Sequence, residues 1–237
     1  MSVSILSLLA LGFVLGLKHA LDADHLAAVS TLATERKSLF ASSIIGAIWG
    51  LGHTISLLIA GVLVIFLHLE IGERASKALE FCVGLMLIVL GVNALCKLAR
   101  GRVHIHTHEH NGYWHVHPHV HEKGRQDEPH KHHGLKSGAR PLLVGMMHGL
   151  AGSAALTLLV LTTIPSPLAG FLYIAVFGIG SIGGMTIMST LFALPAKLTS
   201  QRFARANFAV RGLAAIFSLA FGVFMIYDIG FVNHFLI

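Results

Sequence analysis

The chain has 237 residues, of which 54% are hydrophobic and only 12% are charged. Because a typical soluble domain carries about 25% charged residues, this composition excludes an ordinary soluble domain and predicts a polytopic membrane protein. The formal net charge of +6 would suit a nucleic-acid partner, but the basic residues lie in loops between apolar segments. We therefore expect the lipid bilayer, and not nucleic acid, to be the partner of this surface.

Six apolar segments are long enough to cross a bilayer, which takes about 20 largely apolar residues. They cover residues 3–30, 39–67, 76–99, 140–163, 167–194 and 207–231. The first is long for one crossing and contains charged residues, so we expect it to be tilted or broken there. The sequence thus predicts an all-α fold with six transmembrane helices.

Within the first span, residues 18–25 place two carboxylates, two imidazoles and one ammonium group in an apolar run. Charged groups inside a bilayer are costly and are kept mainly where they pair, line a water-filled cavity or bind something. Imidazole nitrogen and carboxylate oxygen form a ligand set for divalent transition metals. The motif therefore predicts an intramembrane metal site.

Helical periodicity leaves open which carboxylate binds the ion. On an ideal helix His19, Asp22 and His25 share one face, whereas Asp24 points away from them. If Asp24 binds the same ion, the helix must unwind or kink near Ala23. Such a break is tolerated at membrane depth only where protein or a water cavity satisfies the backbone.

The two halves of the chain resemble each other at a nearly constant spacing. Residues 16–19 match 145–148, residues 47–53 match 175–181, and residues 90–92 match 221–223, at offsets of 129, 128 and 131. Because each half has three spans, the two copies must enter the membrane from opposite sides. This pattern predicts a 3+3 inverted repeat with residues 1–99 and 140–237 as its halves. Transporters built in this way bind substrate near the midplane, where the halves meet.

Further polar groups in the spans extend the candidate site. His53 lies in the second span, His148 occupies the repeat position of His19, and Ser153 occupies that of Asp24. The predicted metal-handling residues are His19, Asp22, Asp24, His25, His53 and His148, with Lys18, Asn93 and Ser153 in supporting positions.

Each of these residues also has a purely structural interpretation. A single buried histidine such as His53 is often a hydrogen-bonded core residue. Asn93 and Ser153 can hydrogen-bond between membrane helices. Lys18 is either a side chain that reaches the membrane boundary or a counter-ion for Asp22, four residues away.

Residues 100–139 form a histidine-rich segment between the two halves. Of the 17 histidines, 11 lie here: His104, His106, His108, His110, His115, His117, His119, His121, His130, His132 and His133. The segment has no apolar run able to fold, so we expect a disordered loop. Alternating histidines are typical of compositional metal binding, as a buffer, a sensor or a delivery arm. The alternative is a solvated linker.

Loop charge predicts the orientation in the membrane. The first, third and fifth loops carry 13 Lys and Arg residues, whereas the second and fourth carry only Arg74 and Lys77. Because basic loops stay cytoplasmic, we expect both termini outside the cell membrane and the histidine-rich loop in the cytoplasm.

The pattern His19-(four residues)-Asp24-His25 in a membrane helix resembles the signature of the nickel/cobalt transporter (NiCoT) family. Residues 51–54, Leu-Gly-His-Thr, are similar to the second motif of that family. Residues 148–153, His-Gly-Leu-Ala-Gly-Ser, resemble its short urease-accessory branch. The resemblance covers essentially the whole chain outside the histidine-rich loop.

This resemblance implies Ni²⁺ or Co²⁺ permeation, with His19, Asp24 and His25 handling the metal and His53 as a further contributor. The chain departs from the longer, eight-span members, whose additional acidic motifs are missing from its second half. Lys18 also stands where an Arg is common. These departures leave metal selectivity and transport rate open.

Together these features predict a secondary uptake permease for Ni²⁺ or Co²⁺ that works by alternating access. The metal is the substrate, and no prosthetic group and no enzymatic activity are expected. No Gly-x-x-x-x-Gly-Lys-Ser/Thr loop is present, so the sequence shows no ATP-driven step. The expected partners besides the lipid and the ion are cytoplasmic metallochaperones of nickel enzymes. The alternatives are a metal exporter, an intramembrane metalloenzyme, and a metal sensor or delivery subunit for a urease or hydrogenase.

Overall fold

The computed structural model describes residues 5–36, 38–67, 72–100, 104–110, 113–119, 134–151, 164, 166–200 and 203–235. Over these residues the helices are α1 Ile5–His19, α2 Ala23–Thr34, α3 Leu39–Leu67, α4 Glu73–Arg100, α5 Gly134–Gly149, α7 Pro167–Ser200 and α8 Ala204–Tyr227. A short π-helix, Asp228–Val232, continues α8. The predicted helical, polytopic fold is confirmed.

Most of the predicted spans reappear as helices of membrane-crossing length. Four described helices, α3, α4, α7 and α8 with its π-turn, are long and apolar enough to cross a bilayer. The pair α1 and α2 passes the same test as one bent span. The remaining predicted span, 140–163, begins within α5, and residues 152–163 lie outside the described residues.

The first span is broken at the charged motif, as expected. Helix α1 ends at His19, α2 begins at Ala23, and their axes differ by 59°. A tight turn joins them, in which the N–H of Asp22 donates to the carbonyl of His19 at 3.1 Å. Asp22 has an extended backbone and stands at the N-cap of α2, a position that Asp favours. The break therefore lies at residues 20–22.

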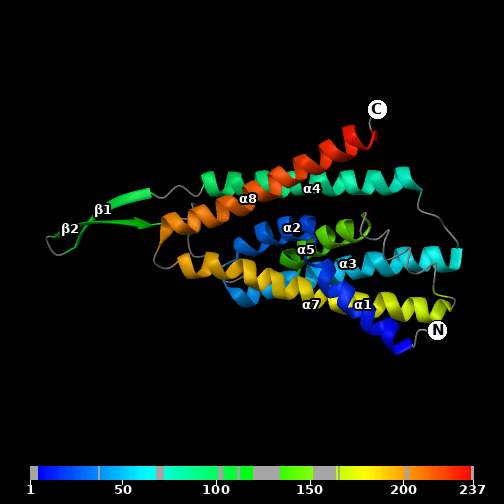
Figure 1. Cartoon of the computed structure of the whole chain (residues 1–237). Helices are drawn as coiled ribbons and strands as arrows, with labels where there is room; N and C mark the ends of the chain where they lie inside the picture. Colours follow the sequence, from blue (N-terminus) through cyan, green and yellow to red (C-terminus); the bar gives the residue numbers. More distant parts are fainter. Residues whose placement is uncertain are drawn as a thin grey trace.

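The helices form two layers with α2 between them. Helices α1, α3, α5 and α7 pack on one another, while α4 and α8 pair along one side (Figure 1). Helix α2 touches both groups, because it contacts α3 and α7 on one side and α4 and α8 on the other. The broken span thus carries the charged motif into the middle of the molecule.

Close helix contacts occur twice, at positions that differ by the repeat offset. A Cβ at Gly16 of α1 would collide with the carbonyl oxygen of Phe177 in α7. A Cβ at Gly145 of α5 would collide in the same way with the carbonyl oxygen of Trp49 in α3. Small residues allow membrane helices to approach this closely. Helix α1 therefore packs on α7 as α5 packs on α3.

Helices α4 and α8 also make two close contacts that the repeat relates to each other. A Cβ at Gly91 would lie 2.7 Å from the backbone nitrogen of Leu219, and one at Gly222 would lie 2.9 Å from that of Ile88. Gly91 and Gly222 are 131 positions apart, and so are Ile88 and Leu219, which is one of the repeat offsets seen in the sequence. Helices α3 and α7 run in opposite directions, as do α4 and α8 (Figure 1). These contacts and directions fit the predicted inverted repeat.

A β-hairpin stands where the sequence predicts a disordered loop. Strand β1, His104–His110, pairs antiparallel with β2, Tyr113–His119. Residues such as Ile105, Trp114 and Val116 alternate with the histidines, and β-branched and aromatic residues favour strands, which compositional reasoning overlooked. Helix α5 also begins at Gly134, inside the predicted loop. Four of the loop histidines lie outside the described residues: His121, His130, His132 and His133.

The hairpin and the chain termini lie at opposite ends of the molecule (Figure 1). This relative placement is the one expected from loop charge, which puts the termini on one side and the histidine-rich segment on the other. The assignment of these ends to the outside and the cytoplasm stays a prediction.

Candidate metal centre

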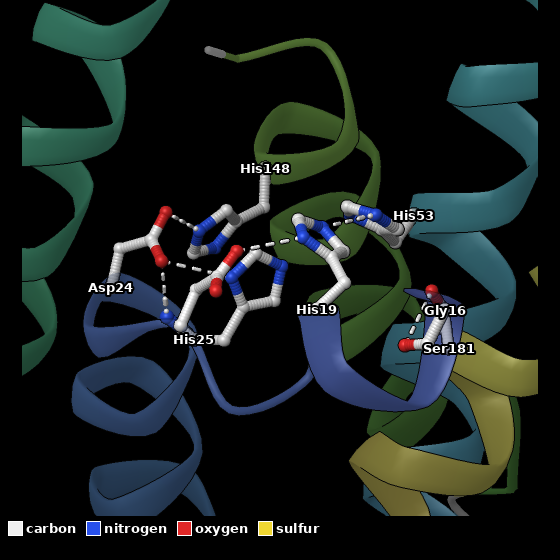
Figure 2. A network of polar contacts seen from close by, with 8 residues as sticks. Gly16, His19, Asp24, His25, His53, His148 and Ser181 are labelled. Atoms are coloured by element: carbon white, nitrogen blue, oxygen red, sulfur yellow. Dashed lines mark hydrogen bonds and ion pairs between the residues drawn. The ribbon is translucent and has the colours of Figure 1, made fainter. Parts of the chain in front are cut away.

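The helix break determines where the motif side chains lie. His19 is the last residue of α1, Asp22 is the N-cap of α2, and Asp24 and His25 lie in the first turn of α2. Because the chain bends between the two helices, the rings of His19 and His25 come within 4.4 Å, measured between centroids. Figure 2 shows His19 on one side of the break and Asp24 and His25 on the other, with their side chains converging.

One group of three imidazoles lies on the His19 side. The Nε2 atoms of His19 and His53 are 3.1 Å apart, and His53 comes from α3. His25 completes the group, and one ligand atom from each residue lies within 4.8 Å of the others. This distance is short enough for one cation to bind all three after a small contraction.

A second group lies on the Asp24 side and contains a residue of the second half. Asp24 Oδ1 is 2.9 Å from Nδ1 of His25, and Asp24 Oδ2 is 2.8 Å from Nε2 of His148 in α5. The backbone N–H of His25 also donates to Asp24 Oδ1, at 2.9 Å. These three residues again offer ligand atoms within 4.8 Å of one another.

Burial leaves imidazole nitrogens of this centre without hydrogen-bond partners. His25, His53 and His148 are fully buried. Nε2 of His25 and the Nδ1 atoms of His53 and His148 have no hydrogen-bond partner in the described structure. Buried polar atoms are normally paired, so several orphaned nitrogens in one cluster need an explanation. A cation bound between His19, His25 and His53 would supply the missing partner of His25 Nε2.

Asp22 has a different position from Asp24. Its Oδ2 atom lies 2.8 Å from Nδ1 of His19, and its side chain is 45% exposed. Among the described residues Asp22 belongs to neither ligand group. A carboxylate that accepts the second ring N–H of a ligating histidine fixes the tautomer and orientation of that ring. The geometry therefore assigns Asp24 to the ligand groups and Asp22 to the support of His19.

Two of the three proposed supporting residues, Lys18 and Asn93, belong to the part of the chain that the structure describes. Lys18 is exposed. On a continuous helix it would lie one turn from Asp22, but the helix breaks between the two residues, and Asp22 contacts His19 instead. Asn93 is half-buried on α4. Ser153 lies outside the described residues.

Two aromatic residues that sequence reasoning missed line the centre. The ring of Trp49 lies 5.5 Å from that of His25 and 5.6 Å from that of His148. The ring of Phe177 lies 5.5 Å from that of His19. The signal was present, because the repeat aligns Trp49 with Phe177 and His148 with His19. Each half thus packs an aromatic ring against the leading histidine of the other half.

The sequence model of the cytochrome c biogenesis protein transmembrane region matches residues 25–224. The urease accessory protein UreH of Bacillus sp. (strain TB-90) is 38% identical over 229 residues, which make up 96% of this chain and 94% of that protein. The chain belongs to this transmembrane family, in the branch of UreH. It is therefore an integral membrane protein, and the predicted resemblance to the urease-accessory branch is confirmed.

More distant relatives occur in plants. The chloroplast proteins FOR GROWTH AND FERTILITY 1 and 2 of Arabidopsis thaliana are 24% and 26% identical to this member of the UreH branch, each over 220 residues. The matches cover 90% and 91% of this chain but only 56% and 55% of those proteins. No solved structure shows a significant match to the chain.

Proposed function

We propose that this protein is a secondary permease that takes up Ni²⁺ or Co²⁺ by alternating access. The observation that carries the proposal is the cluster of two buried ligand groups at the break of the first span. The ion is the substrate, which binds on its way through the membrane.

The donor set suits this cargo. Four imidazoles and one carboxylate offer nitrogen-rich coordination, which divalent ions of the late first transition row prefer over Mg²⁺ or Ca²⁺. The affinity order also places Ni²⁺ above Co²⁺ and Fe²⁺ at sites of this kind. Because metal binding requires neutral imidazole, protons compete with the ion, which offers a route to proton coupling.

The position of the ligands suits alternating access. His19, Asp24, His25 and His53 come from the first half of the repeat, and His148 comes from the second. In inverted-repeat transporters, the halves rock about a site at their interface. Movement of one half against the other would therefore change which side of the membrane reaches the ion.

The relatives support nickel as the first substrate to test. UreH is named as a urease accessory protein, and urease is a nickel enzyme. With both termini outside, the hairpin would face the cytoplasm. Its histidines would then receive imported ions before cytoplasmic metallochaperones take them up.

The decisive experiment measures nickel flux into proteoliposomes with the protein in a known orientation. We expect His53→Gln and Asp24→Asn to abolish flux at equal protein content, because each removes a ligand from one group. His234→Asn is the matched control, since His234 is exposed and has a φ of 53°, which Asn tolerates.

The same experiment separates the alternatives. Flux away from the hairpin side would identify an exporter. Tightly held metal without flux would identify a sensor or delivery protein, and hydrolytic activity of the metal-loaded protein would identify an enzyme. Normal flux in both ligand variants would contradict the proposal.

A further inference from the structure

We propose that the centre offers two alternative positions for one ion, and that the two positions use opposite ring nitrogens of His25. The inference deepens the proposed function, on which it rests only for the identity of the cation. It concerns how the ion is bound, whether or not it crosses the membrane.

His25 is the single residue common to the two ligand groups found among the described residues. One group contains His19 and His53, and the other contains Asp24 and His148. The ring of His25 lies 4.4 Å from that of His19 and 4.1 Å from that of His148, measured between centroids. It therefore stands between the two groups and can serve either.

The two nitrogens of His25 face different groups. Nδ1 lies 2.9 Å from Asp24 Oδ1, which places it on the carboxylate side. Nε2 is buried without a hydrogen-bond partner, and Figure 2 shows this nitrogen turned toward His19. The geometry thus pairs Nδ1 with Asp24 and His148, and Nε2 with His19 and His53.

The other ligands are already grouped in the same way. The Nε2 atoms of His19 and His53 contact each other at 3.1 Å, and Asp22 holds the opposite nitrogen of His19. On the far side, Nε2 of His148 contacts Asp24 at 2.8 Å. The rings of His53 and His148 also approach each other across the two groups, at 6.4 Å between centroids, which is farther than the 4.4 and 4.1 Å that separate His25 from His19 and from His148. His25 therefore stands nearer to a member of each group than those two rings stand to each other.

The chemistry of a neutral imidazole makes the two positions alternatives. It carries one lone pair available for coordination and one N–H, so it ligates through one nitrogen at a time. When the ion is on Nε2, the Nδ1–H donates to Asp24, which is the usual carboxylate support of a ligating histidine. When the ion is on Nδ1, Asp24 itself becomes a ligand. Two divalent ions on one ring would also repel strongly in this buried site.

The inference predicts two different coordination spectra from one binding site. The test uses Co²⁺ absorption on the purified full-length protein in which the eleven loop histidines are replaced by glutamine, so that the hairpin does not contribute. We expect one Co²⁺ per chain in this background. Asp24→Asn should retain one ion with nitrogen ligands only, whereas His53→Gln should retain one ion with mixed nitrogen and oxygen ligands.

Removal of the shared residue should affect both positions. His25→Gln is expected to weaken Co²⁺ binding by more than about 100-fold, because the loss of a mere outer partner already costs 10–100-fold. The double variant His53→Gln/His148→Gln retains His25 but breaks both groups, and it should lose binding to a similar extent. His234→Asn is again the control for folding and for nonspecific binding.

Several outcomes would overturn the inference. These are two Co²⁺ ions per chain in the background protein, identical spectra for Asp24→Asn and His53→Gln, or undiminished binding in His25→Gln. If His25→Gln fails to fold, the spectral difference between the other two variants still decides. If the spectra differ but nickel does not cross the membrane, the proposed transport is wrong and the two ion positions stand. If nickel crosses but the spectra are identical, the two positions are wrong and transport stands.

Discussion

At the scale of single residues, the two carboxylates of the motif occupy the opposite places from those that straight-helix periodicity predicts. Asp24 contacts two fully buried histidines, whereas Asp22 is 45% exposed and lies 2.8 Å from Nδ1 of His19. The first arrangement suits a metal ligand, and the second suits a group that orients a ligand. Substitutions of Asp24 and of Asp22 should therefore have different effects on metal binding.

The role of Asp22 predicts a graded response to substitution. Asp22→Ala should lower Ni²⁺ affinity about 10–100-fold, because His19 loses the acceptor that holds its ring. Asp22→Asn should retain most of the affinity, since its amide oxygen still accepts the N–H of His19. Competition titration of the purified protein measures both. An Asn variant as weak as the Ala variant would show that charge, and not ring orientation, is what Asp22 contributes.

At the scale of elements, the hairpin pairs histidines of one strand with histidines of the other. Its register pairs His104 with His119, His106 with His117, and His108 with His115. Because directly paired residues share a face and alternate residues return to it, this register predicts one common face for the histidine positions of both strands. Metal binding should then depend on the order of residues and not only on the number of histidines.

This register predicts that exchanging residues within the hairpin changes its nickel binding even though the composition stays the same. Swapping His106 with Thr107 and His117 with Val116 moves one cross-strand pair to the opposite face, and it should reduce the nickel bound by the loop. The matched control exchanges Thr107 with Val116, which are themselves cross-strand partners, and leaves the histidine face intact. Equilibrium dialysis against wild type provides the readout. Equal binding in all three proteins would favour purely compositional binding.

At the scale of the whole molecule, close backbone contacts join the two halves of the predicted repeat. Gly16 on α1 and Gly145 on α5 occupy equivalent places, each against a carbonyl oxygen of the opposite half. Because that neighbour is backbone, the structure cannot yield by rotating a side chain. Both halves should therefore respond alike to an added methyl group.

Gly16→Ala and Gly145→Ala are each expected to destabilise the protein by about 1–3 kcal/mol, the usual cost of overpacking. The control is Gly183→Ala, whose new Cβ would meet only a side-chain carbon of Leu17 at 3.9 Å. Thermal unfolding in detergent measures the loss of stability. If only one of the two substitutions lowers the stability, the contacts in the two halves are not equivalent.

The orientation in the membrane is a second property of the whole molecule that can be tested. In a Cys82→Ser/Cys96→Ser background, Gly72→Cys should be labelled from outside the cell and Tyr113→Cys from the cytoplasm. Gly72 stands in open space, so the new thiol is accessible. An impermeant maleimide applied to intact cells and to inverted vesicles distinguishes the sides. The reverse labelling pattern would invert the proposed topology.

The local features of this protein were readable in its sequence. Long apolar runs indicate spans, an interrupted run such as residues 18–25 indicates a site, and a repeated offset indicates two related halves. Each depends on the order of residues along one segment. The alternating β-branched residues of the hairpin carried a signal of the same local kind, which the histidine count concealed.

Contacts between segments required the tertiary structure. Periodicity on a straight helix grouped His19 with Asp22 and His25, but the 59° break brings Asp24 to His148 and leaves Asp22 at the edge. Trp49 joins the centre because α3 packs against both α5 and α2, which brings its ring to His148 and to His25. The sequence by itself determined which residues are available to bind a cation. Only the packing of helices from both halves decided which of them meet, because a ligand set depends on distances between side chains that are far apart along the chain.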